Sequence, residues 1–259
     1  MNSFTWFPRR IWSNTDVKYA LVILNSDISN QDRLIKLWNR ASFRVLVDGG
    51  ANHWYRLSQV KRAGIINPEP NLITGDFDSI KPEIKKYYET EFPNCKVVCT
   101  PDQDSTDFTK SLQEVSKHIH DKDINSVYAF TEYGGRLDQI FGLFETLFHA
   151  TKIQNLPSVF LVSSNSTDWL LPAGTHTIDL QSNEATNLES NKDANLEDCH
   201  CGLIPIGEPC TNVKTSGLKW DLCGSQTLAF GTLVSTSNGF ASNVVTVDNK
   251  TPLIWTMEN

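Results

Sequence analysis

The feature that most constrains the fold is an alternation, from Tyr19 to Thr151, of short apolar runs with amphipathic segments of helical length. This alternation is typical of parallel strands joined by crossover helices. The expected strands are Tyr19–Asn25, Phe43–Asp48, Leu72–Gly75, Cys95–Cys99 and Ser126–Phe130. The expected helices lie near Gln31–Asn39, Ala51–Val60, Lys81–Thr90, Ser105–Ile119 and Arg136–Thr151. We therefore expect an amino-terminal three-layer α/β domain with a mostly parallel sheet.

The character of the chain changes after Pro157, where helical periodicity fades and Gly, Pro and Asn separate short β-rich runs. Such spacing is typical of a β-sandwich or barrel. The runs are Ser158–Val162, Trp169–Leu171, His176–Leu180, Leu203–Ile206, Leu228–Val234, Val244–Val247 and Leu253–Thr256. We expect two domains, an α/β domain over residues 1–155 and a β-sandwich over residues 156–259.

Two segments fall outside this pattern. The stretch from Met1 to Asn14 contains Arg9 and Arg10 but no sustained amphipathic repeat, so we expect an ordinary arm. Residues 181–198 carry five acids against one lysine, a composition that buries little apolar surface. We expect a mobile hairpin insertion within the second domain.

Composition limits the partners and the compartment. The 23 Lys and Arg residues against 30 Asp and Glu residues give a net charge of −7, and no basic tract is present, which argues against nucleic acid or an anionic membrane as partner. No apolar run approaches the roughly 18 residues of a membrane span. Six cysteines lack paired zinc spacing, and the amino terminus has no apolar signal region. We expect a cytoplasmic protein.

Acidic and glycine-rich clusters follow the expected strands of the first domain, at the strand ends where open α/β sheets bind ligands. In the first cluster Asp48 ends a strand, and Gly49 and Gly50 allow a ligand to approach the backbone before a helix begins. A tight turn with a helix cap explains the same three residues.

The second cluster places Asp76 and Asp78 two residues apart at a strand end. If the segment stays extended, both carboxylates point the same way and suit Mg²⁺, which prefers oxygen ligands and bridges to phosphates. Alternatively, Asp78 or Ser79 caps the following helix, but capping leaves Asp76 unexplained.

A third and a fourth cluster open helices. In the third, Asp104 and Asp107 are one turn apart, with Lys110 one turn further. An acid-rich first turn next to a solvated lysine gives the same pattern.

In the fourth cluster, Arg136 follows a double glycine and stands two residues before Asp138. Its guanidinium has the fork geometry for phosphate oxygens, although an exposed charge pair is the alternative.

In the second domain, Trp220 stands beside Gly, Lys and Asp in G-L-K-W-D-L. Its indole offers a stacking face for an aromatic cationic ring. The alternative is a core tryptophan on a sandwich strand.

Together the motifs closely resemble those of thiamine pyrophosphokinase of the animal type, from about Lys18 to Met257. The motifs are G-D-F-D-S, D-Q-D-x-T-D-F-x-K, G-G-R-x-D-Q, G-L-K-W-D-L and F-G-T-L-V-S-T-S-N, in the family's order. The resemblance implies a homodimer with sites shared between chains. It also implies transfer of diphosphate from ATP to the hydroxyl of thiamine, with release of AMP.

The resemblance also implies roles for individual residues. The implied ligands of Mg²⁺ are Asp76, Asp78 and Asp107. The implied catalytic residues are Asp48, Asp107, Arg136 and Asp138. The transfer needs an acceptor for the hydroxyl proton, and the sequence does not choose between Asp48 and Asp138 for this role. The implied ATP-binding residues are Asp48, Asp76, Lys110 and Arg136. The implied thiamine-binding residues are Gln103, Trp220 and Ser237.

Two departures from the family pattern and two rival functions remain. Thr131 and Glu132 stand where members commonly have further glycines, and the insertion at 181–198 is longer than the family leads us to expect. The rivals are a metal-dependent phosphohydrolase, which leaves Trp220 without a task, and a non-catalytic nucleotide-sensing protein. Release of AMP that depends on thiamine excludes both.

Overall fold

The computed structural model describes residues 2–12, 17–119, 122–181 and 196–259, and it divides into two compact units. One unit is Lys18–Ser164, and the other joins Met1–Val17 to Asn165–Asn259. The sequence analysis drew the boundary at 155/156 and kept the amino-terminal arm in the first domain. The division differs because strand β7 (Ser158–Val162) pairs with the α/β sheet, while strand β1 (Ser3–Trp6) pairs with β9 of the β-rich unit.

The sheet of the α/β unit is parallel, in the order β7-β6-β2-β3-β4-β5. Its other strands are β2 (Tyr19–Ile23), β3 (Phe43–Val47), β4 (Leu72–Gly75), β5 (Lys96–Cys99) and β6 (Ser126–Phe130). Every residue of β2 is buried, as expected for a central parallel strand covered on both faces. The predicted parallel sheet is confirmed.

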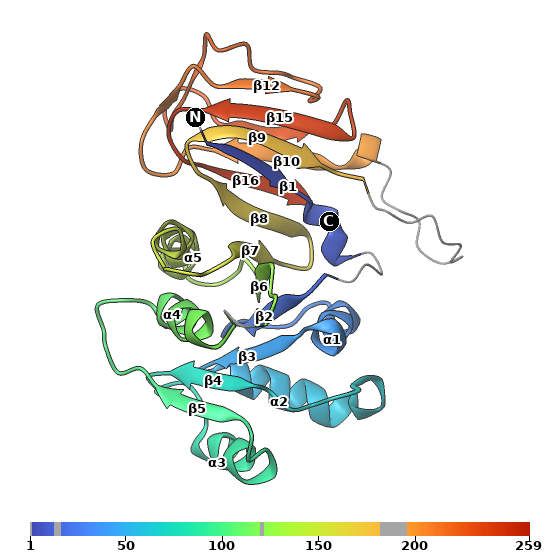
Figure 1. Ribbon diagram of the computed structural model, residues 1–259, viewed down its shortest axis with the longest axis vertical. Helices are drawn as coiled ribbons and strands as arrows, with labels where there is room; N and C mark the ends of the chain where they lie inside the picture. Colours follow the sequence, from blue (N-terminus) through green and yellow to red (C-terminus); the bar gives the residue numbers. More distant parts are fainter. Residues whose placement is uncertain (1, 13–16, 120–121, 182–195) are drawn as a thin grey trace. The chain divides into compact units, whose positions relative to one another are not determined.

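Helices cover both faces of this sheet. They are α1 (Gln31–Arg40), α2 (Gly50–Val60), α3 (Pro82–Glu91), α4 (Asp107–Ile119) and α5 (Leu137–Ala150), with a short 3₁₀ turn η2 (Arg62–Gly64). Figure 1 shows α4 and α5 on one side of the sheet and α1 and α2 on the other. The chain runs outward from β2 to β5, and α4 then carries it back to β6 on the opposite side of β2. Strand order therefore reverses at β2, which is where doubly wound sheets form a ligand crevice.

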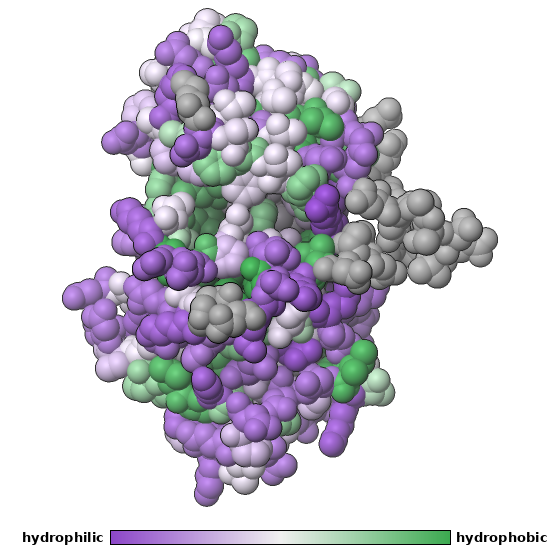
Figure 2. All heavy atoms as spheres, viewed as in Figure 1, coloured by the Kyte–Doolittle hydropathy of each residue, from purple (hydrophilic) through white to green (hydrophobic). Residues whose placement is uncertain are grey.

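The interior of the α/β unit is apolar and aromatic. The indoles of Trp38 on α1 and Trp54 on α2 stack with ring centroids 3.8 Å apart, and both are fully buried. Asn30 caps α1 by accepting a hydrogen bond from the backbone N–H of Arg33 at 3.1 Å. The face drawn in Figure 2 is mostly hydrophilic over this unit, in keeping with the apolar interior.

The other unit is β-rich, as predicted. Its strands form two sets, β1-β9-β15-β12 and β14-β10-β16-β8, plus the pair β11-β13. They are β8 (Ser166–Leu171), β9 (Gly174–Asp179), β10 (His200–Ile204), β11 (Cys210–Thr211), β12 (Lys214–Ser216), β13 (Thr227–Leu228), β14 (Ser235–Gly239), β15 (Val244–Asn249) and β16 (Leu253–Glu258). The ring centroids of Trp6 in the first set and Trp169 in the second lie 5.8 Å apart, so aromatic rings pack between the two sets.

The stretch expected to be an ordinary amino-terminal arm contains β1 and the 3₁₀ turn η1 (Pro8–Ile11). One expectation for this unit was wrong. The run Leu228–Val234 is mostly loop, since only its first residue lies in a strand, at the end of β13. Residues 182–195 of the predicted insertion lie outside the described residues, and Leu196–Asp198 after them form the 3₁₀ turn η3. In the described parts of the chain, no helix has the length and apolar character to cross a membrane.

Candidate active site

Asp48 directly follows β3, and its side chain is hydrogen-bonded to the loop that follows β4. Its φ is +44°, and its carboxylate accepts backbone hydrogen bonds from Ser79, at 3.3 and 3.2 Å, and Ile80, at 3.0 Å. The side chain is only 3% exposed, and burial raises the pKa of Asp48 against the opposing effect of these hydrogen bonds. Gly75 has a φ of +152°, and a Cβ there would lie 2.7 Å from the Cβ of Asp48. The Asp48 position therefore requires glycine at the end of β4.

Asp76 and Asp78 lie in a turn, not in an extended segment. Phe77 between them has a φ of +67°, and the backbone N–H of Asp78 donates to Asp76 Oδ1 at 3.1 Å. Gln103 Nε2 donates to Asp76 Oδ2 at 3.0 Å, and this bond is the main reason that the pKa of Asp76 is lowered. Asp78 is exposed and accepts a hydrogen bond from the Ser79 hydroxyl at 2.8 Å. The turn gives the two carboxylates different partners.

Asp107 is the first residue of α4, because the Thr106 hydroxyl caps the helix by accepting from the backbone N–H of Thr109 at 3.1 Å. Lys110 Nζ lies 2.9 Å from Asp107 Oδ1 as an ion pair, but this buried oxygen receives no hydrogen bond of good geometry. The same ammonium donates to the carbonyl oxygens of Thr100, at 2.8 Å, and Asp102, at 2.7 Å.

Lys110 therefore anchors the loop before α4. Its side chain is buried, its ammonium donates to two carbonyls, and it forms an ion pair with one carboxylate. The sequence analysis had placed Lys110 on ATP.

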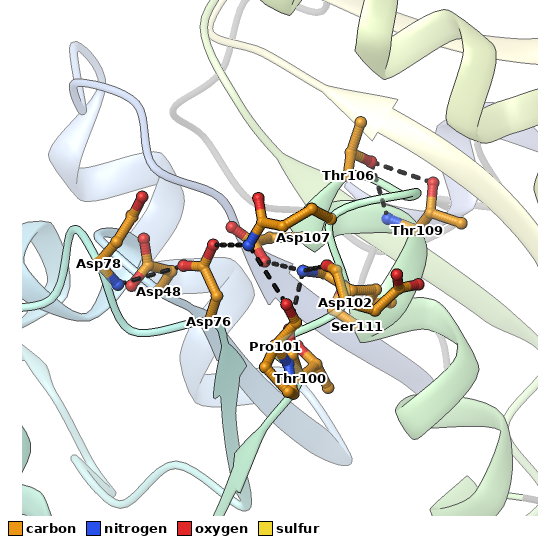
Figure 3. A network of polar contacts seen from close by, with 12 residues as sticks. Asp48, Asp76, Asp78, Thr100, Pro101, Asp102, Thr106, Asp107, Thr109 and Ser111 are labelled. Carbon is orange, nitrogen blue, oxygen red and sulfur yellow. Dashed lines mark hydrogen bonds and ion pairs between the residues drawn. The ribbon is translucent and has the colours of Figure 1, made fainter.

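Three carboxylates converge where β3, β4 and α4 meet (Figure 3). Asp48, Asp76 and Asp107 each offer an oxygen, and these oxygens all lie within 4.8 Å of one another. The sequence analysis had grouped Asp76 and Asp107 with Asp78, but the structure gathers Asp48 with them instead. Three acids beside one ammonium leave negative charge, which a hard divalent cation with oxygen ligands would balance.

A cavity of about 870 Å³ opens beside this group, at the carboxyl ends of β2, β3 and β6. Asp48, Asp78 and Asp107 line it, together with the Gly134–Asp138 loop that leads into α5. Arg136 Nε donates to Asp138 Oδ1 at 3.1 Å, and its Nη2 pairs with Asp138 Oδ2. This hydrogen bonding lowers the pKa of Asp138 and raises that of Arg136. Both side chains are exposed.

The other predicted thiamine residues belong to the β-rich unit. Trp220 is 66% exposed, which excludes the core-tryptophan alternative. The side-chain amide of Asn238 fixes the backbone of Trp220 through two hydrogen bonds. The Trp220 N–H donates to Asn238 Oδ1 at 3.1 Å, and Asn238 Nδ2 donates to the Trp220 carbonyl at 2.9 Å. Ser237, in β14, has a φ of +52°. The indole is thus presented to solvent on a fixed backbone.

Among the residues that line the cavity, Asn25, His53 and Glu132 received no site role from sequence reasoning. Asn25 lies two residues beyond the end of β2. Ligand-binding groups often follow strand ends in such sheets, and this rule indicates the position, although it holds neither an acid nor a glycine. Glu132 accepts from the Ser164 backbone N–H at 3.3 Å and from the Ser164 hydroxyl, which anchors the loop where the family pattern has glycines.

Two family models match the chain. Residues 34–160 match the thiamin pyrophosphokinase catalytic domain, and residues 175–254 match the thiamin pyrophosphokinase vitamin B1 binding domain. The first match falls in the α/β unit and the second in the β-rich unit.

Full-length relatives agree with these matches. Thiamine pyrophosphokinase 3 of Oryza sativa subsp. japonica is 33% identical over 254 residues, with 92% of this chain and 86% of that protein covered. Thiamin pyrophosphokinase 1 of Caenorhabditis elegans is 32% identical over 235 residues, with coverages of 89% and 84%. The structure of thiamin pyrophosphokinase from Candida albicans superposes with a TM-score of 0.79 at 26% identity, covering 99% of this chain and 92% of that one. The chain belongs to the thiamine pyrophosphokinase family.

Proposed function

We propose that this chain transfers diphosphate from ATP to the hydroxyl of thiamine, giving thiamine diphosphate and AMP. The observation that carries the proposal is the group formed by Asp48, Asp76 and Asp107 at a cavity at the carboxyl edge of the sheet. A carboxylate cannot neutralise a phosphate, so an acidic phosphate site requires a bound cation. Both substrates agree with the two family matches, one to a catalytic and one to a vitamin B1 binding domain.

Mg²⁺ is the proposed metal, and the donor set fits it. The three carboxylates supply only oxygen ligands, and Asp107 Oδ1 is buried without a hydrogen bond of good geometry. Asp48, Asp76 and Asp107 would hold the ion. When bound, Mg²⁺ supplies the positive charge that phosphate oxygens need during transfer.

The chain's own residues orient the phosphates and the acceptor. Arg136 exchanges Asp138 for phosphate oxygens, which its planar fork matches in the same bidentate way. This exchange frees the Asp138 carboxylate to accept the proton of the thiamine hydroxyl. Asp48 is less suited to this role, because Ser79 and Ile80 hold its oxygens.

Thiamine is proposed to meet the Trp220 indole, Gln103 and Ser237, in a homodimer whose sites are shared between chains. Apolar side chains left exposed support the assembly: Leu137 and Phe141 on α5 are 66% and 49% exposed, and Phe230 in the loop after β13 is 66% exposed. Apolar surface of this kind is typical of protein interfaces. A two-fold axis brings the same surface of each chain to its partner.

The proposed location is the cytoplasm. All six cysteines are free, including the buried Cys199, Cys201 and Cys210. Free thiols suit a reducing compartment. The net charge of −7 supports the expectation that neither nucleic acid nor membrane is a partner.

The test is to incubate the purified protein with ATP and Mg²⁺, with and without thiamine, and to separate the products by chromatography. We expect AMP and thiamine diphosphate in equal amounts, and neither without thiamine. Nucleotide hydrolysis that ignores thiamine would identify a phosphohydrolase, and ATP binding without any product would identify a nucleotide sensor.

A further inference from the structure

Three residues outside the acidic group form a hydrogen-bonded chain beside the cavity. Arg56 Nη2 lies 2.9 Å from His53 Nδ1, and His53 Nε2 lies 3.2 Å from Asn25 Oδ1. Arg56 and His53 are on α2, and Asn25 follows β2, so the contacts join two elements at the edge of the sheet where strand order reverses. Asn25 and His53 both line the cavity.

The chemistry of arginine fixes the direction of every hydrogen bond in this chain. A guanidinium only donates, so His53 Nδ1 must accept from Arg56 and carries no proton. The ring proton of the neutral imidazole is then on Nε2, which donates to Asn25 Oδ1. Burial and Arg56 lower the pKa of His53 against the opposing charge of Asp27, 3.7 Å from Nδ1, which keeps the imidazole neutral at pH 7.

This arrangement fixes the Asn25 amide. Because Asn25 Oδ1 accepts from His53, the Nδ2 group of Asn25 points away from His53 with its two N–H donors. No described residue accepts a hydrogen bond from these donors. The amide packs over Gly49, where a Cβ would come within 2.5 Å of Asn25 Cγ, Oδ1 and Nδ2. Gly49 therefore leaves the space that the amide fills, directly after Asp48.

We propose that Asn25 binds the polyphosphate of the nucleotide through its Nδ2 donors, and that His53 and Arg56 are positioning residues that hold this amide in the binding orientation. The inference rests on the proposed function in taking the anion to be ATP. An uncharged donor suits this position, because it contacts phosphate oxygens without competing with the three carboxylates for the cation.

The first test is the variant Asn25→Ala, assayed for steady-state kinetics and for ATP binding by calorimetry in the presence of Mg²⁺ and absence of thiamine. Hydrogen bonds to a charged oxygen are lost equally in the ground and transition states, so KM and Kd for ATP should rise on the order of tenfold while kcat and KM for thiamine stay unchanged. The control is His118→Leu, on α4 away from the cavity lining, which should leave all four constants unchanged.

The positioning role has its own test. His53→Leu removes the donor to Asn25 Oδ1 and should raise KM for ATP about threefold, whereas His53→Gln keeps an N–H donor and should restore most of the affinity. The double variant Asn25→Ala with His53→Leu should be no worse than Asn25→Ala alone, because His53 acts through Asn25. Melting temperatures verify that each variant is folded.

The outcomes separate this inference from the proposed function. An active wild-type protein whose ATP constants do not change in Asn25→Ala, or additive losses in the double variant, would overturn the inference and leave the function intact. ATP binding that weakens in Asn25→Ala, in a protein that makes no thiamine diphosphate, would support the inference and reject the function. A wild-type protein that binds no ATP would overturn both.

Discussion

Asp107 is the residue whose replacement tests the metal site most cleanly. Asp107→Asn keeps the shape of the side chain but removes the charge, and Lys110 still donates to the carbonyls of Thr100 and Asp102, so the loop should keep its place. Losing a ligand of the cation should cost several kcal/mol in the transition state, and kcat/KM should fall on the order of a hundredfold or more.

Asp104→Asn is the matched control for this change. Asp104 is an exposed acid in the same loop, and its carboxylate is not part of the group that faces the cavity. The control should retain activity. Equal activity of the two variants, with an unchanged requirement for Mg²⁺, would make Asp107 only a first-turn helix residue.

Trp220 tests the thiamine side at the same scale. Removing its exposed indole in Trp220→Ala should weaken thiamine binding by about 2 kcal/mol and leave ATP binding unchanged. Trp220→Phe keeps a ring face and should recover part of the loss. The measurement is calorimetric titration with each ligand, and an unchanged Kd for thiamine would reject the stacking role.

Sequence identified several site positions, but not their contacts. Asp48 and Asp107 were found because strand ends and first helical turns are visible in the pattern of residues. The different placement of Asp78 could not be predicted, because the turn depends on a positive φ at Phe77, a conformation that is rare for a bulky residue and has no mark in sequence. The burial of Lys110 depends on two loop carbonyls, and no local pattern shows where such a loop folds back.

At the scale of elements, strands and helices of the α/β unit were predictable because buried strands and amphipathic helices have different periods. Strand β1 was not predictable, because four residues are too few to show a period. Its partner β9 also lies far away in the sequence. Strand β7 was recognised as a strand but assigned to the wrong sheet, since its partner β6 is a tertiary contact.

Strand β1 carries a prediction about pH. Trp6 Nε1 donates to Nδ1 of the fully buried His176 at 3.0 Å, and His176 Nε2 faces the carbonyl of Pro172 at 2.8 Å. Burial lowers the pKa of His176 below its ordinary value of 6.5. The unfolded chain therefore takes up this proton first as pH falls, so the contribution of His176 to the free energy of unfolding is complete above about pH 6.5 and declines below it.

The measurement is the melting temperature from pH 7.5 to 5.0 for the wild-type protein and His176→Gln. We expect the wild type to lose more stability over this range than the variant, because glutamine does not titrate. Parallel pH profiles would show that His176 keeps the same pKa in both states.

At the scale of the whole molecule, the proposed dimer shares each site between chains. Asp107→Asn and Trp220→Ala then damage different chains of one site, so a mixed dimer of these inactive variants holds one intact site and one doubly damaged site. Under subunit exchange about half the dimers are mixed, and roughly a quarter of all sites should recover activity. Absence of recovery, with exchange demonstrated, would mean that one chain forms the whole site.

The most direct test of the account is the fate of labelled phosphate when the protein acts on ATP and thiamine with Mg²⁺. In diphosphate transfer the thiamine hydroxyl oxygen forms a bond to the β-phosphorus, and the bond between the β-phosphorus and the oxygen that bridges it to the α-phosphorus breaks. AMP therefore leaves with the bridging oxygen, and both outer phosphates move to thiamine together. With ATP labelled at the β-phosphate, we predict that the label appears in thiamine diphosphate in equal amount to the AMP released. Label retained in ADP, or released as free phosphate, would contradict the account.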